Sequence, residues 1–225
     1  MHMVLSPLAY LELLFHCHHA DTEVAAMGIS AENQPLRVER IELVRQSAST
    51  CFVEMDDEAV ADHIDDCAQL GIPPARCGRI WMHTHPGNSA EPSVTDEQTF
   101  RRAFGGCDWS VMFILARGGQ MYAGLQFAAL SGARMTIPVT IDWSVWPTVA
   151  MELLDPVQVQ AWYERHMGCV RSEPVQLAGG LVFDHDLLDE AAWRAETDEM
   201  DAEYALAREM LEAQGQAGEM GGIDA

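Results

Sequence analysis

The sequence contains no lysine: all 13 basic residues are arginine, against 35 acidic residues, and the formal net charge is −22. A charge of this sign and size argues against unaided binding to nucleic acid or to an anionic membrane. Two explanations of the missing lysine stay open. A GC-rich genome favours arginine codons, whereas a chain without lysine also offers no side-chain amine to lysine-directed conjugation.

Long apolar runs and paired cysteines are absent as well. No run approaches the roughly 20 apolar residues that span a bilayer. The apolar stretch 5–15 contains Pro7 and Glu12 and follows no basic residue, unlike a secretory signal. The six cysteines are Cys17, Cys51, Cys67, Cys77, Cys107 and Cys169. They show neither a C-x-x-C pair nor the spacing of a disulfide framework, so we expect reduced thiols in a cytoplasmic protein.

The sequence has the pattern of one α/β layered domain over residues 1–143, in which alternating apolar residues predict strands and apolar stripes predict helices. The expected strands are 24–30, 36–46, 50–55, 79–83, 109–116, 121–128 and 135–142. Two helices are expected, one over 57–70 that ends at Gly71 and one over 93–104 that ends at Gly105. Uneven alternation near Arg40 predicts a bulge or bend in the second strand.

The C-terminal third differs in charge and pattern. Residues 144–215 are expected to form a helical, acidic extension with one helix over 156–167, and the Gly-rich residues 216–225 a disordered tail. A long acidic helix would carry one apolar stripe. The stripe consists of Trp193, Met200, Tyr204, Ala207 and Leu211. We interpret it as an intrachain contact or the contact surface of a homodimer.

Residues 81–96 read WMHTHPGNSAEPSVTD and carry the strongest chemical pattern in the chain. His83 and His85 are two residues apart, so on a strand their side chains share one face. Asp96 follows eleven residues later in the first turn of the expected helix, and the loop between them can bring its carboxylate back. Two imidazoles and one carboxylate form a three-ligand zinc site whose fourth position is open to water, as in catalytic zinc.

Each part of this pattern also has a purely structural explanation. Two histidines on a strand are often only partly buried polar residues. Ser93 and Asp96 fit a capping box at a helix start, which needs no metal. Pro86 and Pro92 are typical of a loop between a strand and a helix. The complete string H-x-H-P-(x6)-S-x-x-D is much rarer than its parts, which favours the metal site.

The complete string resembles the signature of the JAMM metalloproteases of the Jab/MPN family: a distant glutamate, H-x-H, seven residues, then S-x-x-D. The match comprises His83, His85, Ser93 and Asp96, and the order of expected strands and helices over 8–143 is also similar. The resemblance implies a cytidine-deaminase-like fold with a mixed sheet flanked by helices. It also implies one Zn²⁺ per chain, held by the two histidines and the aspartate, with Ser93 as a hydrogen-bond donor.

The family also requires a catalytic glutamate near the start of an early strand. Glu23 heads the first expected strand, whereas Glu12 lies deep in an apolar segment and Glu54 closes the third strand, so we choose Glu23. With zinc to polarise the scissile carbonyl and activate water, Glu23 would take a proton from the water and pass it to the leaving amine. Ser93 would donate to the developing oxyanion.

The resemblance implies a deubiquitinase-like isopeptidase that cuts the peptide or isopeptide bond after the C-terminal glycine of a ubiquitin-like protein. The enzymes that conjugate this modifier would then be further partners, which the missing lysine weakly supports. Two other functions stay open. One is a non-catalytic MPN-type scaffold, and the other is the same chemistry on a peptide unrelated to ubiquitin.

Two smaller groups of residues attract attention for their metal-binding side chains. The segment from His16 to His19, sequence HCHH, could bind a second metal ion, line a pocket wall or form an exposed loop. Cys67 and Cys107 lie in apolar contexts, and we expect both to be inert core thiols.

Overall fold

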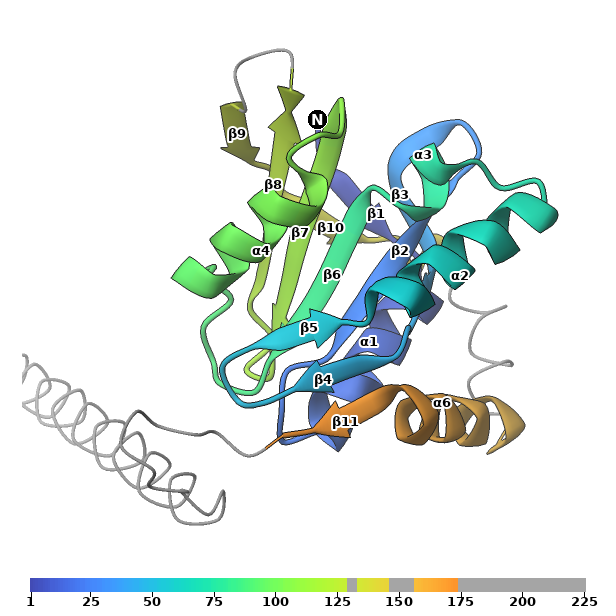
Figure 1. The fold of residues 1–225 in the computed structure, drawn as a ribbon, viewed down its shortest axis with the longest axis vertical. Helices are drawn as coiled ribbons and strands as arrows, with labels where there is room; N and C mark the ends of the chain where they lie inside the picture. The colour runs from blue at the N-terminus through green and yellow to red at the C-terminus, as the bar shows by residue number, and fades with distance from the viewer. Residues whose placement is uncertain (129–132, 146–155, 174–225) are drawn as a thin grey trace, which may run out of the picture. The chain divides into compact units, whose positions relative to one another are not determined.

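An eight-stranded mixed sheet forms the centre of the part of the chain that the computed structural model describes, which comprises residues 1–128, 133–145 and 156–173 (Figure 1). The strand order is β10-β1-β3-β2-β6-β7-β8-β9. The strands are β1 (Met3–Leu5), β2 (Ala25–Ala31), β3 (Gln34–Glu42), β6 (Ile80–His85), β7 (Trp109–Ala116), β8 (Met121–Phe127), β9 (Ala133–Thr136) and β10 (Val139–Ile141). β1 is parallel to β3 and β10, β6 is parallel to β7, and the other neighbours are antiparallel. The sheet curls, so that β10 also lies near β8.

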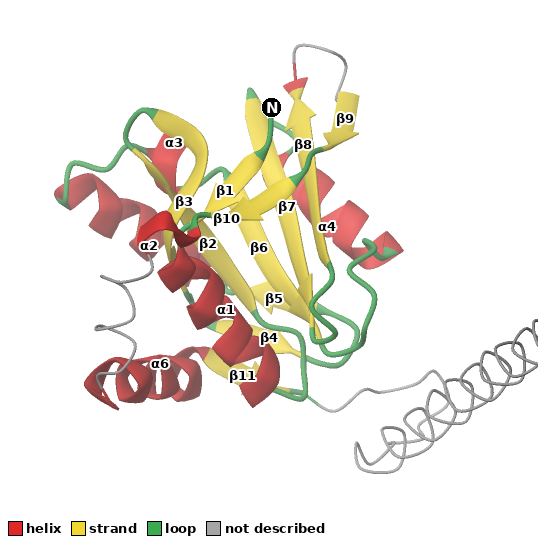
Figure 2. Cartoon of the chain, turned by 180° about the vertical axis from the view of Figure 1, so that it is seen from behind, coloured by secondary structure: helices red, strands yellow, loops and turns green. Residues whose placement is uncertain are grey.

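Helices cover both faces of this sheet. Helix α1 (Pro7–His19) packs on one face and lies in front of the sheet in Figure 2, whereas α4 (Val94–Phe104) packs on the other and lies in front in Figure 1. Successive side chains of β6 point to opposite faces of the sheet, so Ile80 and Met82 pack with α1 while Trp81 packs with α4. The central strand β7, WSVMFILA, is apolar almost throughout because both of its faces are buried. The expected α/β class with a mixed sheet and flanking helices is confirmed.

The local signals for the two expected helices are also confirmed. Helix α2 (Asp57–Gln69) begins after Asp56, whose carboxylate accepts the backbone N–H of Ala59 at 2.8 Å. It ends before Gly71, which has a φ of 73°, a left-handed conformation that glycine adopts at little cost. The one-turn helix α3 (Pro74–Cys77) follows.

Several strands differ from expectation. The stretch before residue 20, for which the sequence pattern predicts no strand or helix, forms β1 and α1. The expected bulge in β3 is present, because the pairing shifts from Ile29–Arg40 to Ser30–Val38. The strand expected over 135–142 is two strands, since Pro138 has no N–H for a ladder and separates β9 from β10.

A second, three-stranded sheet lies beside the first. Its strands are β4 (Gln46–Ala48), β5 (Val53–Met55) and β11 (Val170–Ser172), in the order β11-β4-β5. The strand expected over 36–46 therefore ends early, and its last residue starts β4 in this other sheet. Because β11 comes from the region expected to be an extension, the second sheet joins that region to the rest of the domain.

The expected domain boundary at residue 143 needs correction. The compact unit runs from Met1 to Glu173, because helix α6 (Pro156–Cys169) packs against α1 and β11 pairs with β4. A short 3₁₀ turn, η2 (Trp143–Val145), follows β10. The acidic helix with its apolar stripe and the tail 216–225 lie outside the described residues. None of the helices in the described ranges has the length and apolar character needed to cross a bilayer.

The HCHH segment forms the end of α1, where it packs against α6. The Nδ1 atoms of His16 and His166 are 3.3 Å apart, and the His19 ring meets that of His166 edge-on at 4.8 Å. Burial lowers the pKa of His16 to about 3 and that of His166 to about 4. Glu12 pairs with Arg165 in the same contact, and burial raises the pKa of Glu12 to about 7, although the guanidinium acts in the opposite direction.

This contact predicts a loss of stability in mild acid. Between pH 6.5 and pH 4.5 the unfolded chain binds more protons at His16 and His166, so their contribution is complete above pH 6.5 and is lost as the pH falls. Glu12 acts in the opposite sense, because its raised pKa favours the folded state at low pH. His166→Gln should therefore reduce the slope of unfolding free energy against pH, by up to about 1.4 kcal/mol per pH unit.

Urea unfolding at a series of pH values measures this slope. The matched control is His18→Gln, which changes an exposed histidine on the same helix and should leave the slope unchanged. If the curves of wild type and His166→Gln ran parallel between pH 4.5 and 6.5, the two histidines would not be responsible for the pH dependence.

Candidate metal centre

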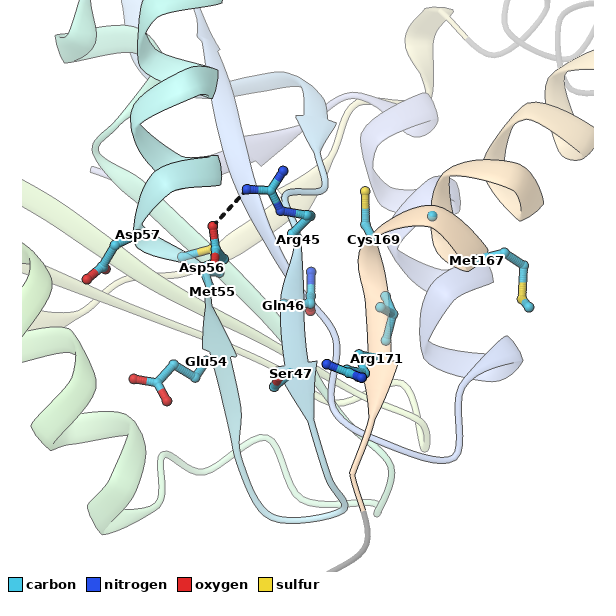
Figure 3. Close-up of a pocket in the computed structure, with 12 residues that line it drawn as sticks. Arg45, Gln46, Ser47, Glu54, Met55, Asp56, Asp57, Met167, Cys169 and Arg171 are labelled. Carbon is cyan, nitrogen blue, oxygen red and sulfur yellow. Dashed lines mark hydrogen bonds and ion pairs between the residues drawn. The ribbon is translucent and has the colours of Figure 1, made fainter.

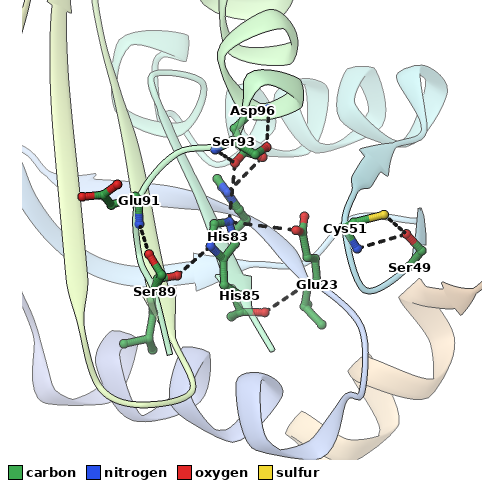
Figure 4. Close-up of polar contacts among 12 residues, drawn as sticks. Glu23, Ser49, Cys51, His83, His85, Ser89, Glu91, Ser93 and Asp96 are labelled. Carbon is green, nitrogen blue, oxygen red and sulfur yellow. Dashed lines mark hydrogen bonds and ion pairs between the residues drawn. The ribbon is translucent and has the colours of Figure 1, made fainter. Parts of the chain in front are cut away.

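Glu23, His83, His85 and Asp96 converge on one point at the end of β6 (Figure 4). Each can offer one ligand atom such that all these atoms lie within 4.8 Å of one another. The structure therefore brings together the three expected metal ligands and the glutamate chosen from the sequence.

Strand pairing explains why the glutamate meets the histidines. His83 and His85 have the same parity on β6 as Trp81, so they lie on the face covered by α4, and the His83 ring stacks on Trp81 at 4.3 Å. In the antiparallel pair β2–β6, Ala25 is opposite His83. Glu23, two residues before Ala25, therefore lies beside the histidine two residues after His83.

Helix α4 supplies the aspartate through its capping box. The Ser93 hydroxyl oxygen accepts the backbone N–H of Asp96 at 3.1 Å, and Asp96 Oδ2 accepts the backbone N–H of Ser93 at 2.7 Å. The same carboxylate faces both histidines, with Oδ1 3.4 Å from His83 Nε2 and Oδ2 3.5 Å from His85 Nε2. The helix cap and the candidate ligand are thus the same carboxylate, so the two interpretations of this residue are compatible.

The distances and the unpartnered atoms fit a metal ion. Separations of 3.4 and 3.5 Å exceed ordinary N–H···O hydrogen bonds. Ligands placed tetrahedrally about zinc at 2.0–2.1 Å are roughly 3.4 Å apart. Within the described residues, Nε2 of His83, Nε2 of His85 and Oε2 of Glu23 are buried and have no hydrogen-bond partner. Buried polar atoms are normally paired, so these atoms are suited to an ion that would satisfy them.

His85 is also held in the tautomer that a metal ligand needs. Its Nδ1 lies 2.9 Å from the carbonyl oxygen of Ser89. A carbonyl only accepts, so Nδ1 carries the hydrogen and Nε2 presents its lone pair to the cluster. A backbone carbonyl on the other ring nitrogen is the usual arrangement around a metal-bound histidine.

The two carboxylates of the cluster have opposite protonation tendencies. Burial, followed by the Asp96 charge, raises the pKa of Glu23 to about 8, although His85 acts against this rise. For Asp96, burial acts to raise the pKa, but the two imidazoles and the Ser93 amide hold the pKa well below the usual range. Asp96 is therefore an anion suited to hold a cation, and the Glu23 carboxyl can gain or lose a proton close to neutral pH.

The centre opens to the surface on the side of His85 and Ser93. The His85 side chain is 13% exposed and Ser93 is exposed, whereas the other three members are buried. Because the Ser93 hydroxyl uses only its oxygen in the capping box, its hydrogen is available to another acceptor.

A hairpin loop between β4 and β5 borders Glu23, and sequence reasoning did not associate it with the site. The Glu23 backbone N–H donates to the carbonyl oxygen of Ser49 at 2.8 Å. Cys51, in the same loop, is exposed, and its Sγ lies 3.6 Å from Ser49 Oγ (Figure 4). The sequence carries no signal for this neighbour, because its position depends on how the second sheet packs against the first.

The two glutamates that were set aside lie away from the centre. Glu12 is buried beneath Arg165, and Glu54 on β5 pairs with Arg102 of α4 at 3.2 Å. Neither belongs to the group of four.

A pocket of about 660 Å³ lies elsewhere, between the second sheet and the end of α6 (Figure 3). Its wall carries Arg45 and Asp56, whose exposed side chains pair at 3.1 Å. It includes none of the four residues of the metal centre, so we assign the pocket no part in the chemistry.

A comparison of the chain with protein-family models finds no match, and a comparison with curated proteins finds none either.

Removing one ligand should release the metal ion. We expect His85→Ala to weaken zinc binding at this centre by more than about 100-fold, because even outer partners of metal ligands contribute 10–100-fold. Zinc per chain and competition with a chelator measure the loss, which should be one ion relative to wild type. His18→Ala, at an exposed position of α1, is the control. Unchanged affinity in His85→Ala would exclude this histidine as a ligand.

Proposed function

We propose that the protein is a zinc-dependent metallopeptidase of the JAMM type, which hydrolyses the peptide or isopeptide bond after the C-terminal glycine of a ubiquitin-like protein. The observation that carries the proposal is the position of Glu23, a buried carboxylate beside a two-histidine, one-aspartate group, with Oε1 3.9 Å from His85 Nε2. The string H-x-H-P-(x6)-S-x-x-D supports the same conclusion independently.

The donor set favours zinc in a catalytic arrangement. Nε2 of His83, Nε2 of His85 and the Asp96 carboxylate would hold the ion, and three protein ligands leave one position for water or substrate. When bound, zinc supplies Lewis acidity, which polarises a carbonyl and lowers the pKa of water from ~15.7 towards ~7.

Glu23 would move the proton. Its carboxylate takes a proton from the attacking water as the new C–O bond forms, and returns it to the amine nitrogen as the C–N bond breaks. The products are a glycine carboxylate and a free amine. Burial favours this role, because it raises the pKa of Glu23 from its ordinary value of 4.5 to about 8, close to neutral pH.

Ser93 would stabilise the negative charge that develops on the carbonyl oxygen. Its oxygen already accepts the Asp96 amide, which fixes the direction of the hydroxyl, and its hydrogen can be donated to the substrate. The exposed position of this serine at the rim suits a contact with a substrate that arrives from solution.

The ubiquitin-like substrate is proposed on chemical and compositional grounds. Glycine residues at the cleavage site let the substrate backbone approach the buried centre closely. A chain without lysine is not itself an acceptor for lysine-directed conjugation, which is suited to an enzyme that works beside a conjugating system.

A non-catalytic scaffold explains the centre less well. A buried carboxylate oxygen of Glu23 and buried imidazole nitrogens without hydrogen-bond partners cost stability, and a protein that only binds partners gains nothing from them. Cleavage assays with different substrates would also detect the other function left open, the same chemistry on a peptide unrelated to ubiquitin.

Replacing the proton carrier should stop turnover without releasing the metal ion. We expect Glu23→Gln to reduce cleavage of a ubiquitin-fold protein fused through Gly-Gly to a reporter by about 10²–10⁴-fold, with zinc content unchanged. The control is Glu54→Gln, which changes an exposed carboxylate on β5. Full activity in Glu23→Gln would mean that another group moves the proton.

Inactivity of zinc-loaded wild type on every ubiquitin-fold fusion would refute the proposed substrate class. Cleavage of peptides without a ubiquitin fold would then favour the same chemistry on another substrate. Inactivity on both, with zinc bound, would favour the scaffold.

A series at Ser93 should separate its cap from its chemistry. Ser93→Ala should lower kcat by ~10²–10³-fold and unfolding free energy by about 1 kcal/mol, since both the donor and the cap are lost. Ser93→Asp retains a cap acceptor but no donor hydrogen, so it should keep stability and lose activity. Ser93→Thr should retain both. Equal activity of the threonine and aspartate variants would exclude the donor role.

A further inference from the structure

A second group of metal-binding side chains lies between α2 and α3, which are adjacent in Figure 1. It consists of His63, Cys67 and Cys77, and one ligand atom from each lies within 4.8 Å of the other two. All three residues are buried, whereas a histidine and two thiols at the surface would be commonplace.

Helix geometry and one turn bring the group together. His63 and Cys67 are four residues apart on α2 and so share one face of the helix. The chain reverses at Gly71, and α3 returns Cys77 to that face. Two hydrogen bonds fix α3 to β2, from Arg76 Nε to the Ser30 carbonyl at 2.8 Å and from Ser30 Oγ to the Arg76 carbonyl at 3.1 Å.

The histidine is held in one tautomer, with a thiol close to its ring. His63 Nε2 lies 3.1 Å from the carbonyl oxygen of Cys77, which can only accept, so Nε2 carries the hydrogen and Nδ1 has the lone pair. Cys67 Sγ lies 4.0 Å from Nδ1 and 3.9 Å from Nε2, so the sulfur is about equally near both ring nitrogens. Nitrogen and sulfur ligands on a tetrahedral zinc ion are about 3.6 Å apart, so a shift of the two side chains would place Nδ1 and Sγ on one ion.

We propose that His63, Cys67 and Cys77 form a second zinc site, separate from the centre at Asp96, whose role is structural. Thiolates with an imidazole select zinc among the common divalent ions. The expectation that Cys67 is an inert core thiol accounts for its burial but not for its two metal-binding neighbours.

The surroundings show what such a site would stabilise. The apolar cluster here is small: only Ile29 joins the two cysteines as buried members, with Ile64 and Ile72 partly buried. An ion bound by residues of α2 and α3 would hold together a part of the fold that has few apolar contacts. Metal ligation of this kind contributes directly to folding free energy.

Water and metal ions have access to the group. A pocket of about 420 Å³ touches His63 and Cys67, and its wall includes Asp62 and Asp66 as well as Arg40. Three protein ligands leave a fourth position, which water from this pocket can fill. The two aspartates belong to a helix with five acidic side chains and no arginine or lysine, a field that attracts cations.

Cobalt substitution in the full chain tests the proposal. The protein is stripped with a chelator under reducing conditions and titrated with Co²⁺. We expect two ions per chain and the intense thiolate-to-cobalt band in the near ultraviolet, which a site of histidines and carboxylate cannot produce. The band should persist in His85→Ala with one ion bound, and disappear in Cys77→Ser.

The control is Cys107→Ser, which changes a partly buried cysteine outside the group and should leave the band intact. The wild-type titration does not depend on the folding of any variant, so it tests for the thiolate site by itself. A wild-type titration without a thiolate band overturns the proposal. A band that survives Cys77→Ser also overturns it. So does the finding of a disulfide between Cys67 and Cys77 in the reduced preparation. None of these results depends on peptidase activity, so the two proposals fail independently.

Discussion

The candidate centre depends on the contacts of one buried charged group, the Asp96 carboxylate. It is buried, and a buried charge persists only where partners compensate its loss of hydration. One oxygen accepts the Ser93 amide that starts α4, and the two oxygens face the two histidines of β6. The carboxylate of the helix and the histidines of the strand therefore face one another at the position where a cation would bind.

The pairing of β2 with β6 is the second constraint, because it decides which side chains face Asp96. A slip of one residue in a strand moves every side chain to the opposite face. Trp81 prevents such a slip, since it is buried against α4 on the same face as the histidines. The packing of an apolar core thus fixes the position of the polar centre.

The two candidate metal sites differ in ways that match their proposed roles. At the first, two imidazoles and a carboxylate lie beside Glu23 and an exposed serine, an arrangement that suits the proposed catalysis. At the second, two thiols and an imidazole lie in a small apolar cluster between two helices. Thiolate ligation between two helices contributes to folding free energy, which suits the proposed structural role.

Features that follow from local periodicity could be predicted from the sequence. Residues two apart on a strand share a face, which placed His83 with His85, and cap residues predicted where α2 and α4 begin and end. The same reasoning placed Asp96 in the first turn of a helix. Glu23 was selected by its position before a strand together with the family resemblance.

Contacts between segments far apart in the sequence could not be predicted in this way. The pairing of His16 with His166, the packing of α6 into the domain, and the approach of Cys77 to His63 join residues whose sequence spacing gives no indication of contact. The physical reason is that periodicity is a property of a short stretch of chain. Contacts between elements depend instead on strand register and on how helices pack over the sheet.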